Sequence, residues 1–416
     1  MSMNNIPQGV QDILVEECLL KRKIENDIMK VFRSFGYGEI ITPTYEYYDV
    51  FKGTSNVFND EMLLKFFDEE GKILALRPDL TTPIARVCAT KLGGETLPIR
   101  LCYTGNAYRF IQGNFGPKQR EFTQSGIELI GAGGAKADAE VIACTIYALL
   151  EAGLEDFQIE LGHSAFFEGI IEKGDFTKGQ IDELKDMIDK KYQFGIMEFI
   201  EKNEIAGESR EILSKITTLF GDVDIVHEVL NYDINQRSKE ALLYLLEVYN
   251  LLKDYCLDKY ISFDLGLVQN IDYYTGIIFK GFARGFGFPI CGGGRYDNLI
   301  KKFGKDMPAT GVAIGIDRVM SAIFSKKEAL PKLNVDALVF AESDSYKTAF
   351  EVCRILRRDN LVIKMDITSN SIEEAKEYAK KCGIGGIFYC RNKDEIVAID
   401  LVNNTQQATN INSLKE

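Results

Sequence analysis

The sequence has no apolar stretch long enough to cross a membrane and no secretory leader. A bilayer-spanning helix needs roughly 20 apolar residues, whereas the most apolar helical stretch, residues 141–150, is shorter and lies between Glu140 and Glu151. The N-terminus lacks the basic segment, apolar run and small-residue cleavage site of a signal peptide. These absences predict a cytoplasmic protein that does not contact a membrane.

Residues that bind metals or form disulfides are scarce or poorly spaced. His163 and His227 are the only histidines and lie far apart in the sequence, so a zinc site of the usual kind is not expected. Both are expected to be ordinary surface or core residues. The nine cysteines are odd in number and form no CxxC pair, which favours reduced thiols in the core. The sequence therefore indicates neither a metal nor another cofactor.

Basic charge is also in short supply. The chain has 62 acidic and 49 basic residues and a formal net charge of −13. Nucleic-acid affinity comes largely from Lys and Arg side chains that neutralise phosphates. Although an acidic chain can carry a local basic face, this balance argues against tRNA as a partner.

Hydrophobic periodicity indicates an α+β core in residues 1–325. Apolar residues at helical spacing predict a helix over residues 15–35, ended by Gly36. Residues 66–78 predict a hairpin, and residues 99–109 and 121–130 predict two strands. The other expected elements are a short strand at 40–43, a helix at 81–92, a helical insertion at about 165–258, two strands and a loop near 263–288, a glycine-rich turn at 291–295 and a helix from residue 311.

Residues 332–402 predict a small C-terminal α/β domain after a linker at Leu330 and Pro331. Its strands are expected at 337–340, 362–365, 386–389 and 396–401, and its helices at 347–357 and 372–381. Strands that alternate with helices favour a compact sheet covered by helices. The polar tail, residues 403–416, is expected to lack regular structure.

The strand at 121–130 carries a candidate binding surface. Because side chains alternate along a strand, Phe122, Gln124, Gly126 and Glu128 share one face. Gly126 leaves a gap between an amide and a carboxylate, which suits a small polar ligand with an ammonium or imidazole N–H. A strand side that simply faces solvent is the alternative.

Further polar residues follow or precede predicted elements. Asp79 and Thr81 could receive an α-amino group, but their spacing also fits the cap of the following helix, which is favoured on spacing alone. Arg109 and Arg318 could each hold a carboxylate or phosphate, and ion pairs within the protein are the usual alternative. Tyr273 and Tyr274 could line a pocket or form a core aromatic pair.

Five segments, in order, resemble the catalytic core of histidyl-tRNA synthetase, a class II aminoacyl-tRNA synthetase. They are LRPDLTTPIAR (76–86), YR…REFTQSGIELIG (108–131), LGLVQNIDYYTG (265–276), CGGGRYD (291–297) and GVAIGIDR (311–318). The resemblance covers roughly residues 5–325 and is specific because all five fall in family order. The segments GVQDIL, PIRLCYTGNAYR and CGGGRYDNLIKKFGKDMPATGVAIGIDRV are closer to regulatory subunits of the short-form ATP phosphoribosyltransferase, which share that core but do not charge tRNA.

This resemblance implies an antiparallel sheet core, with a C-terminal domain in the place of an anticodon-binding domain. It also implies a histidine pocket. In that pocket Asp79 and Thr81 would hold the α-amino group, Arg109, Gln124 and Glu128 would surround the side chain and carboxylate, Tyr273 and Tyr274 would close around the imidazole, and Gln269 would stand where the synthetase has an arginine.

Departures from the synthetase pattern bear on activity. The arginine replaced by Gln269 balances negative charge when the carboxylate attacks ATP, and an amide cannot supply that charge. The acidic residue expected just after Arg109 is also missing, because Phe110, Ile111 and Gln112 follow. Arg318 is retained, so ATP binding is expected to be weakened but not lost. The C-terminal region holds 12 Lys and Arg against 13 Asp and Glu, without the basic excess typical of tRNA binding.

The resemblance therefore predicts a non-catalytic regulatory subunit. It would bind the short catalytic ATP phosphoribosyltransferase and permit the first step of histidine biosynthesis. By resemblance it would dimerise through its core within an allosteric hetero-octamer, with histidine as effector. The alternatives are a divergent histidyl-tRNA synthetase, which Gln269 and the acidic balance disfavour, and an amino-acid-sensing relative with another partner.

Overall fold

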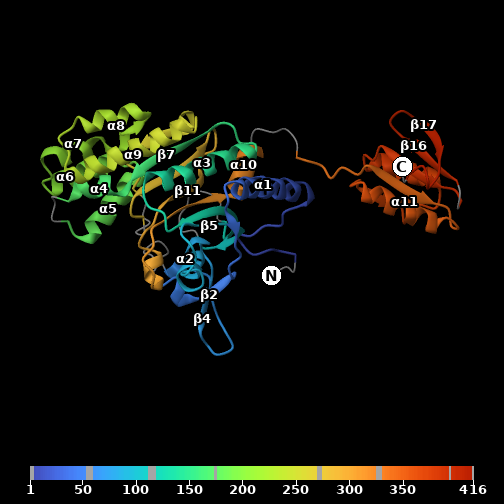
Figure 1. Cartoon of the computed structure of the whole chain (residues 1–416), viewed down its shortest axis with the longest axis horizontal. Coiled ribbons are helices and arrows are strands. Elements are labelled where there is room, and N and C mark those ends of the chain that lie inside the picture. The colour runs from blue at the N-terminus through green and yellow to red at the C-terminus, as the bar shows by residue number, and fades with distance from the viewer. Residues whose placement is uncertain are drawn as a thin grey trace. The chain divides into compact units, whose positions relative to one another are not determined.

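The chain forms two compact units, Met1–Leu330 and Pro331–Glu416 (Figure 1). The structure, a computed structural model, describes residues 4–52, 60–110, 119–172, 176–268, 274–324, 330–392 and 395–414. In these ranges no helix is long and apolar enough to cross a membrane. Each unit has its own sheet and its own buried clusters.

A nine-stranded sheet forms the centre of the first unit within the described residues. In spatial order its strands are β1 (Gly38–Glu39), β5 (Ile99–Tyr108), β6 (Glu121–Ile130), β12 (Ala309–Gly315), β11 (Pro289–Arg295), β10 (Ile277–Ala283), β7 (Phe157–His163), β9 (Ile261–Asp264) and β8 (Phe220–Gly221). Neighbours are antiparallel except for the parallel pairs β1–β5 and β7–β9. This confirms the predicted α+β fold with an antiparallel sheet core.

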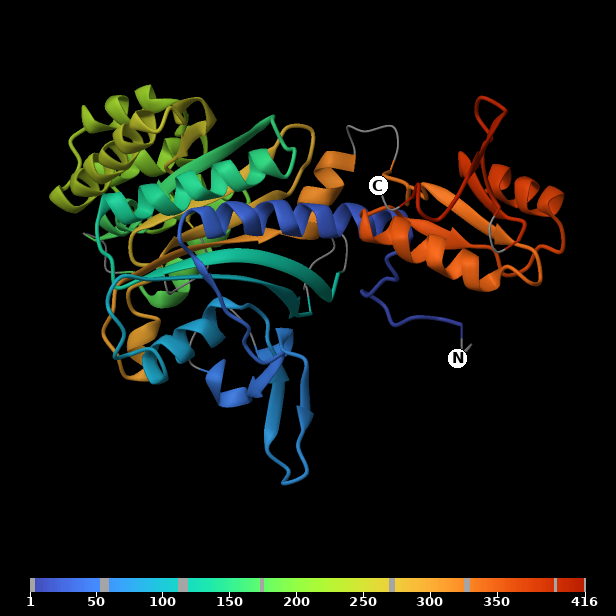
Figure 2. The same cartoon turned by 45° about the vertical axis from the view of Figure 1, so that its right-hand side comes forward.

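Three helices pack into the buried cluster on one face of this sheet. They are α1 (Val15–Ser34), α3 (Ala135–Glu151) and α10 (Ile316–Phe324), and α1 lies beside α3 along the sheet (Figure 2). Helix α1 buries Leu20, Ile24, Ile28 and Phe32, one residue per turn, as the sequence pattern predicted. It ends where Gly36 adopts φ +84°, a conformation that glycine reaches without steric cost.

The opposite face is covered by smaller elements. Helix α2 (Thr81–Thr90) and the 3₁₀ helix η5 (Ile300–Phe303) pack together there and share a second buried cluster with β5. A three-stranded sheet follows, in the order β2 (Tyr45–Tyr47), β4 (Ile73–Leu76) and β3 (Lys65–Phe67), with the 3₁₀ helices η1 (Tyr48–Val50) and η2 (Asp60–Met62). The predicted hairpin at 66–78 is confirmed as β3 and β4.

The residues between β7 and β9 are mainly helical, as their pattern predicted. The helices are α4 (Ser164–Ile171), α5 (Lys178–Asp189), α6 (Gln193–Lys202), α7 (Gly207–Lys215), α8 (Val223–Leu230) and α9 (Gln236–Asp254), with the 3₁₀ helices η3 (Ile216–Thr218) and η4 (Asp258–Tyr260). We call this segment the helical insertion. Its longest helix, α9, packs against α4, α3 and β7, so the insertion is joined to the core through α9.

The second unit has a five-stranded sheet in the order β14 (Ile363–Met365), β13 (Ala337–Ala341), β15 (Gly386–Cys390), β16 (Ile396–Asp400) and β17 (Thr405–Thr409). Helices α11 (Tyr346–Arg358) and α12 (Ile372–Lys381) contribute to two separate buried clusters. The predicted strands and helices are confirmed. The tail was wrongly expected to lack regular structure, because residues 405–409 pair with β16.

Three local predictions in the first unit are wrong. Residues 40–43 form no strand, because the carbonyls of Thr42 and Pro43 accept hydrogen bonds from the buried Arg77 guanidinium instead of a neighbouring strand. The glycine-rich segment 291–295 is strand β11 rather than a turn, and residue 311 lies in β12 rather than in a helix. Here glycines mark strands packed too closely for side chains: a Cβ on Gly293 would overlap the Gly311 carbonyl. Among the cysteines, Cys256 and Cys382 are exposed, not in the core.

Candidate functional site

Strand β6 and its two neighbours build the floor of a polar site. Gln124, Gly126 and Glu128 alternate along β6 on the face covered by α2. Strand β5 places Tyr103 opposite Gly126, and β12 places Gly311 opposite Glu128. The shared face predicted from the alternation is thus formed, and it faces the protein interior.

The Glu128 carboxylate lies at the centre of this floor and is 1% exposed. Thr81 donates its hydroxyl hydrogen to Glu128 Oε1 at 2.7 Å, and Tyr296 donates its own to Oε2. Burial, together with the negative charge of Asp79, raises the pKa of Glu128 to about 8, even though both hydroxyls favour the ionised form. Among the described residues Glu128 makes no ion pair, so its ionised form would lack a cationic partner.

Two glycines make room for this arrangement. A Cβ on Gly311 would overlap the Glu128 carboxylate, and a Cβ on Gly126 would overlap the Tyr103 hydroxyl and the Val312 carbonyl. The gap predicted at Gly126 is therefore partly occupied by the Tyr103 side chain from β5. The Tyr103 hydroxyl is buried close to Thr81 and Glu128 but has no hydrogen-bond partner of good geometry among the described residues.

Asp79 takes the capping role that was favoured on spacing alone. Its carboxylate accepts hydrogen bonds from the Thr82 backbone N–H at 2.8 Å and the Thr82 hydroxyl at 3.1 Å, which caps the start of α2. Burial raises the pKa of Asp79, while the Thr82 hydrogen bonds and the Arg109 charge act in the opposite direction. Asp79 therefore adds a second buried carboxyl group beside Glu128.

Three of the other predicted site residues, Arg109, Gln124 and Tyr274, are described by the structure. The Arg109 guanidinium lies 4.7 Å from the centre of the Phe122 ring. Gln124 Oε1 is buried and accepts no hydrogen bond from any described residue. The Tyr274 ring would contact a Cβ on Gly294, and burial followed by the charges of Glu128 and Asp79 raises its pKa. Gln269 and Tyr273 lie outside the described residues.

Arg318 faces another part of the sheet. Its Nη1 donates to the Pro289 carbonyl at 2.7 Å, and burial lowers its pKa. The structure thus brings together Asp79, Thr81, Glu128 and Tyr274, with Arg109 near enough to affect the Asp79 charge. Gln124 lies further along β6, on the same face as Glu128. Nothing in the described residues joins Arg318 to them.

Sequence reasoning missed Tyr103, Tyr296 and Gly311. Tyr296 follows the glycine-rich strand, and its ring reaches Glu128 across 168 positions of sequence. The two other residues become visible only when the register of β5, β6 and β12 is known. Hydrophobic alternation gives the face of each strand but not its partners, so these contacts could not be derived from spacing.

The arrangement suits a small cation better than an anion. Burial raises the pKa of both carboxyl groups, and the Asp79 charge adds to the shift of Glu128. A bound ammonium with a second N–H donor would stabilise both as carboxylates. The unpaired Gln124 Oε1 and Tyr103 hydroxyl offer an acceptor and a donor. Within the described ranges no three His, Cys, Asp or Glu side chains gather as metal ligands.

The raised pKa of Glu128 predicts a pH dependence of stability. An unfolded glutamate titrates near pH ~4.3, so between about pH 4.5 and 8 the folded state binds more protons and stability falls as pH rises. One extra bound proton corresponds to a slope of about 1.4 kcal/mol per pH unit. Glu128→Gln should flatten the curve of unfolding free energy against pH between 5 and 8, measured by chemical denaturation.

Glu140→Gln provides the control for this measurement. Although burial opposes it, the Arg100 hydrogen bonds hold the pKa of Glu140 below its usual value, so Glu140 titrates below this pH window. Glu140→Gln should therefore leave the slope unchanged. A wild-type slope that Glu128→Gln does not alter would show that Glu128 is ionised in the free protein.

Comparisons with known proteins agree with the fold. The family model for histidyl-tRNA synthetase matches residues 9–319. A histidyl-tRNA synthetase structure from Nostoc sp. PCC 7120 superposes with a TM-score of 0.77 at 21% identity, over 99% of this chain and 98% of that one. At this identity the likeness concerns the fold alone. The predicted class II synthetase-like fold is thereby confirmed.

Relatives with higher identity carry a narrower description. The ATP phosphoribosyltransferase regulatory subunit of Acetivibrio thermocellus is 46% identical over 94% of this chain and 93% of its own length. That of Ruminiclostridium cellulolyticum is 43% identical over 98% and 97%. A Bacillus halodurans structure described as an ATP phosphoribosyltransferase regulatory subunit/histidyl-tRNA synthetase has a TM-score of 0.83 at 30% identity, covering 94% of this chain and 99% of that chain. The chain belongs to the ATP phosphoribosyltransferase regulatory subunit family, as the sequence resemblance predicted.

Proposed function

We propose that this protein is a histidine-sensing, non-catalytic subunit required for the activity of a short-form ATP phosphoribosyltransferase. That enzyme condenses ATP with phosphoribosyl pyrophosphate in the first step of histidine biosynthesis. Histidine, the end product, would bind the site around Glu128 and favour a state of the assembly with low activity. It can do so only by binding that state more tightly than the active one.

The observation that carries this proposal is the buried Glu128 carboxyl group without a cationic partner among the described residues. Histidine has an α-ammonium group and an imidazole N–H, which match the two carboxyl groups of Asp79 and Glu128. Its carboxylate would lie near the Arg109 charge, which acts on Asp79. Thr81 and Gln124 would provide further hydrogen bonds, and Tyr274 would cover the ring from the side of β11.

Loss of synthetase chemistry follows from the sequence departures. Gln269 replaces an arginine whose charge stabilises the reacting phosphate. Loss of such a group raises the activation barrier by about 3–4 kcal/mol, by analogy with other electrostatic catalysts. The acid expected after Arg109 is absent. Arg318 remains as a contact for nucleotide phosphate, so nucleotide binding without reaction is compatible with the proposal.

Assembly completes the proposal. The chain would dimerise through its first unit and bind the catalytic subunit in a cytoplasmic hetero-octamer, without tRNA. The second unit, with nearly balanced charge, would contribute to partner contacts or stability. The support is the family membership and the net charge of −13, which disfavours nucleic acid.

The test combines three measurements on the purified chain. With the short catalytic subunit added, we expect phosphoribosyl-ATP formation that needs both chains and that histidine inhibits. We expect calorimetry to detect histidine binding to this chain alone. We expect no histidine-dependent ATP–pyrophosphate exchange, because Gln269 cannot supply the missing charge.

Robust exchange would instead support the divergent histidyl-tRNA synthetase, which the fold of the synthetase neighbours would allow. Histidine binding without any activation of the catalytic subunit would indicate an amino-acid sensor with another partner. Activation of the catalytic subunit without histidine binding would support the role as a regulatory subunit but contradict the proposed histidine-sensing site.

A further inference from the structure

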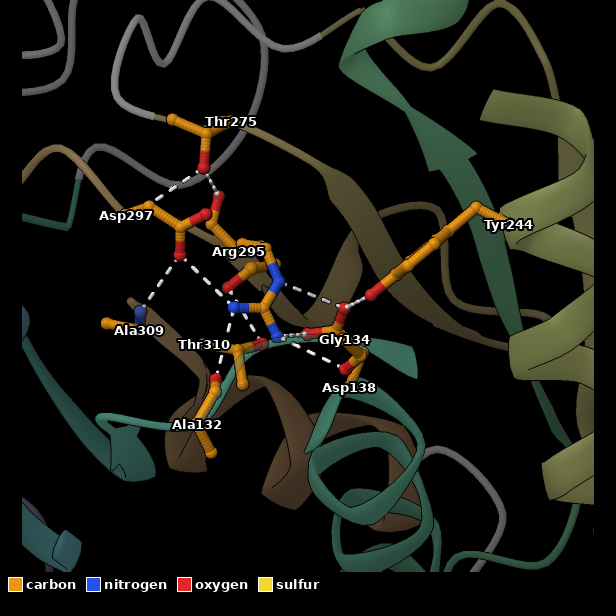
Figure 3. Close-up of polar contacts among 10 residues, drawn as sticks. Ala132, Gly134, Asp138, Tyr244, Thr275, Arg295, Asp297, Ala309 and Thr310 are labelled. Atoms are coloured by element: carbon orange, nitrogen blue, oxygen red, sulfur yellow. Dashed lines mark hydrogen bonds and ion pairs between the residues drawn. The ribbon is translucent and has the colours of Figure 1, made fainter. Parts of the chain in front are cut away.

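A buried ion pair between Arg295 and Asp138 lies at the end of β11 (Figure 3). Arg295 donates from Nε and Nη2 to the two oxygens of Asp138 at 3.1 and 2.8 Å. Its Nη1 reaches Asp297 Oδ1 at 3.1 Å and the Ala132 carbonyl at 3.2 Å, and Nη2 also reaches the Gly134 carbonyl at 3.4 Å. The Asp138 side chain is 0% exposed and that of Arg295 is 7% exposed. All three nitrogens of the guanidinium therefore donate hydrogen bonds within the protein.

The helical insertion contributes one hydroxyl group to this pair. Tyr244, in the middle of α9, donates its hydroxyl hydrogen to Asp138 Oδ2 at 2.5 Å (Figure 3). The His163 ring packs edge-on against Tyr244 with centroids 5.5 Å apart. Burial and then the nearby Arg295 charge lower the pKa of His163 to about 4, so it is neutral here. Asp138 thus joins α3, α9 and β11.

Arg295 also lies between two residues of the pocket. Its backbone carbonyl accepts the Thr275 N–H at 2.8 Å, and Thr275 directly follows Tyr274. The next residue after Arg295 is Tyr296, which donates to Glu128. The preceding residue, Gly294, leaves the space that the Tyr274 ring occupies. A shift of the Arg295 backbone would therefore move both tyrosines relative to Glu128.

We propose that Arg295 is a positioning residue for the pocket, and that Tyr244 couples α9 of the helical insertion to it through Asp138. A planar guanidinium bonded to a carboxylate in two places fixes direction as well as distance. The pair therefore transmits the position of α9 to the backbone that carries Tyr274 and Tyr296. That the ligand is histidine rests on the function proposed above; the coupling itself rests only on these contacts.

Tyr244→Phe is the sharpest probe, because it removes one hydroxyl group and leaves the ring against His163. Tyr249→Phe is the matched control: it lies on the same helix, its ring packs against Phe263, and its hydroxyl has no hydrogen bond among the described residues. We measure histidine affinity by calorimetry and amide hydrogen exchange of the full chain without ligand. Tyr244→Phe should weaken histidine binding by roughly 3- to 10-fold, the range expected for the loss of one hydrogen bond.

Hydrogen exchange distinguishes positioning from a general loss of stability. Tyr244→Phe should speed exchange in residues 274–283 and 289–297, while Tyr249→Phe should not. Faster exchange confined to α3 and α9, with unchanged histidine affinity, would overturn the proposal. If the wild-type chain does not bind histidine but Tyr244→Phe still loosens 274–283 and 289–297, the proposed ligand is wrong and the positioning role stands. If the wild-type chain does not bind histidine and Tyr244→Phe does not speed exchange in these residues, both the proposed ligand and the positioning role are wrong.

Discussion

Replacing Glu128 by glutamine is expected to weaken histidine binding by about 2–3 kcal/mol, roughly 30- to 150-fold. The amide has nearly the same volume as the carboxyl group, so it should fit between Thr81, Tyr296 and the space left by Gly311. The amide oxygen can accept a hydrogen bond, but it cannot supply the negative charge that pairs with an ammonium group. Histidine inhibition of the assembled enzyme should weaken by a similar factor.

The measurement is calorimetric titration of histidine into the purified chain, followed by inhibition curves with the catalytic subunit. Glu140→Gln is the control, because Glu140 lies on helix α3, on the other face of the sheet, and pairs with Arg100 of β5. It should leave both values unchanged. If Glu128→Gln keeps wild-type affinity and inhibition, histidine acts elsewhere, and the carboxyl pair has another ligand.

The protons released or taken up on histidine binding provide a second test of the role of Glu128. The free Glu128 carboxyl has a pKa of about 8, so at pH 7 it is largely protonated. Pairing with a cationic ligand would favour its ionised form. Binding should then release a proton, or move it to the imidazole, and titrations in buffers of different ionisation enthalpy separate the two. Glu128→Gln should abolish the difference between buffers.

Much of the site could be predicted because its residues share short segments. Alternation along residues 121–130 was enough to place Gln124 and Glu128 on one face. Asp79 and Thr81 stand at the start of a helix, where polar side chains are expected. The helix at 15–34 and the hairpin at 65–76 also follow from local pattern. Local periodicity thus gave these elements and the placement of these four residues on them.

Contacts between distant segments could not be predicted in this way. The Asp138–Arg295 pair joins residues 157 positions apart, and neither residue has a local signal. Residues 291–295 look like a turn because glycine favours turns, whereas the structure uses those glycines where strands and rings approach closely. Residues 40–43 have β-forming side chains, yet the buried Arg77 takes their carbonyls. In each case tertiary packing overrides local preference.

The largest stability effect is expected from Arg295→Met. The change leaves the Asp138 carboxylate 0% exposed, with the Tyr244 hydroxyl as its remaining side-chain partner. Breaking a buried ion pair by removing one partner costs about 3–5 kcal/mol, because the other charge stays buried and unpaired. The unfolding free energy of the full chain should fall by this amount, measured by guanidinium denaturation followed by far-ultraviolet circular dichroism, which the helices of the first unit dominate.

Two further variants distinguish the stability lost through the unpaired buried charge from the stability lost through packing. Arg100→Met breaks the partly exposed pair with Glu140 and should cost no more than about 1 kcal/mol. The double variant Asp138→Leu with Arg295→Met removes both charges, so it should recover part of the stability lost in Arg295→Met alone. If Arg295→Met costs no more than Arg100→Met, the buried pair does not stabilise the fold more than the partly exposed pair does, and the prediction is wrong.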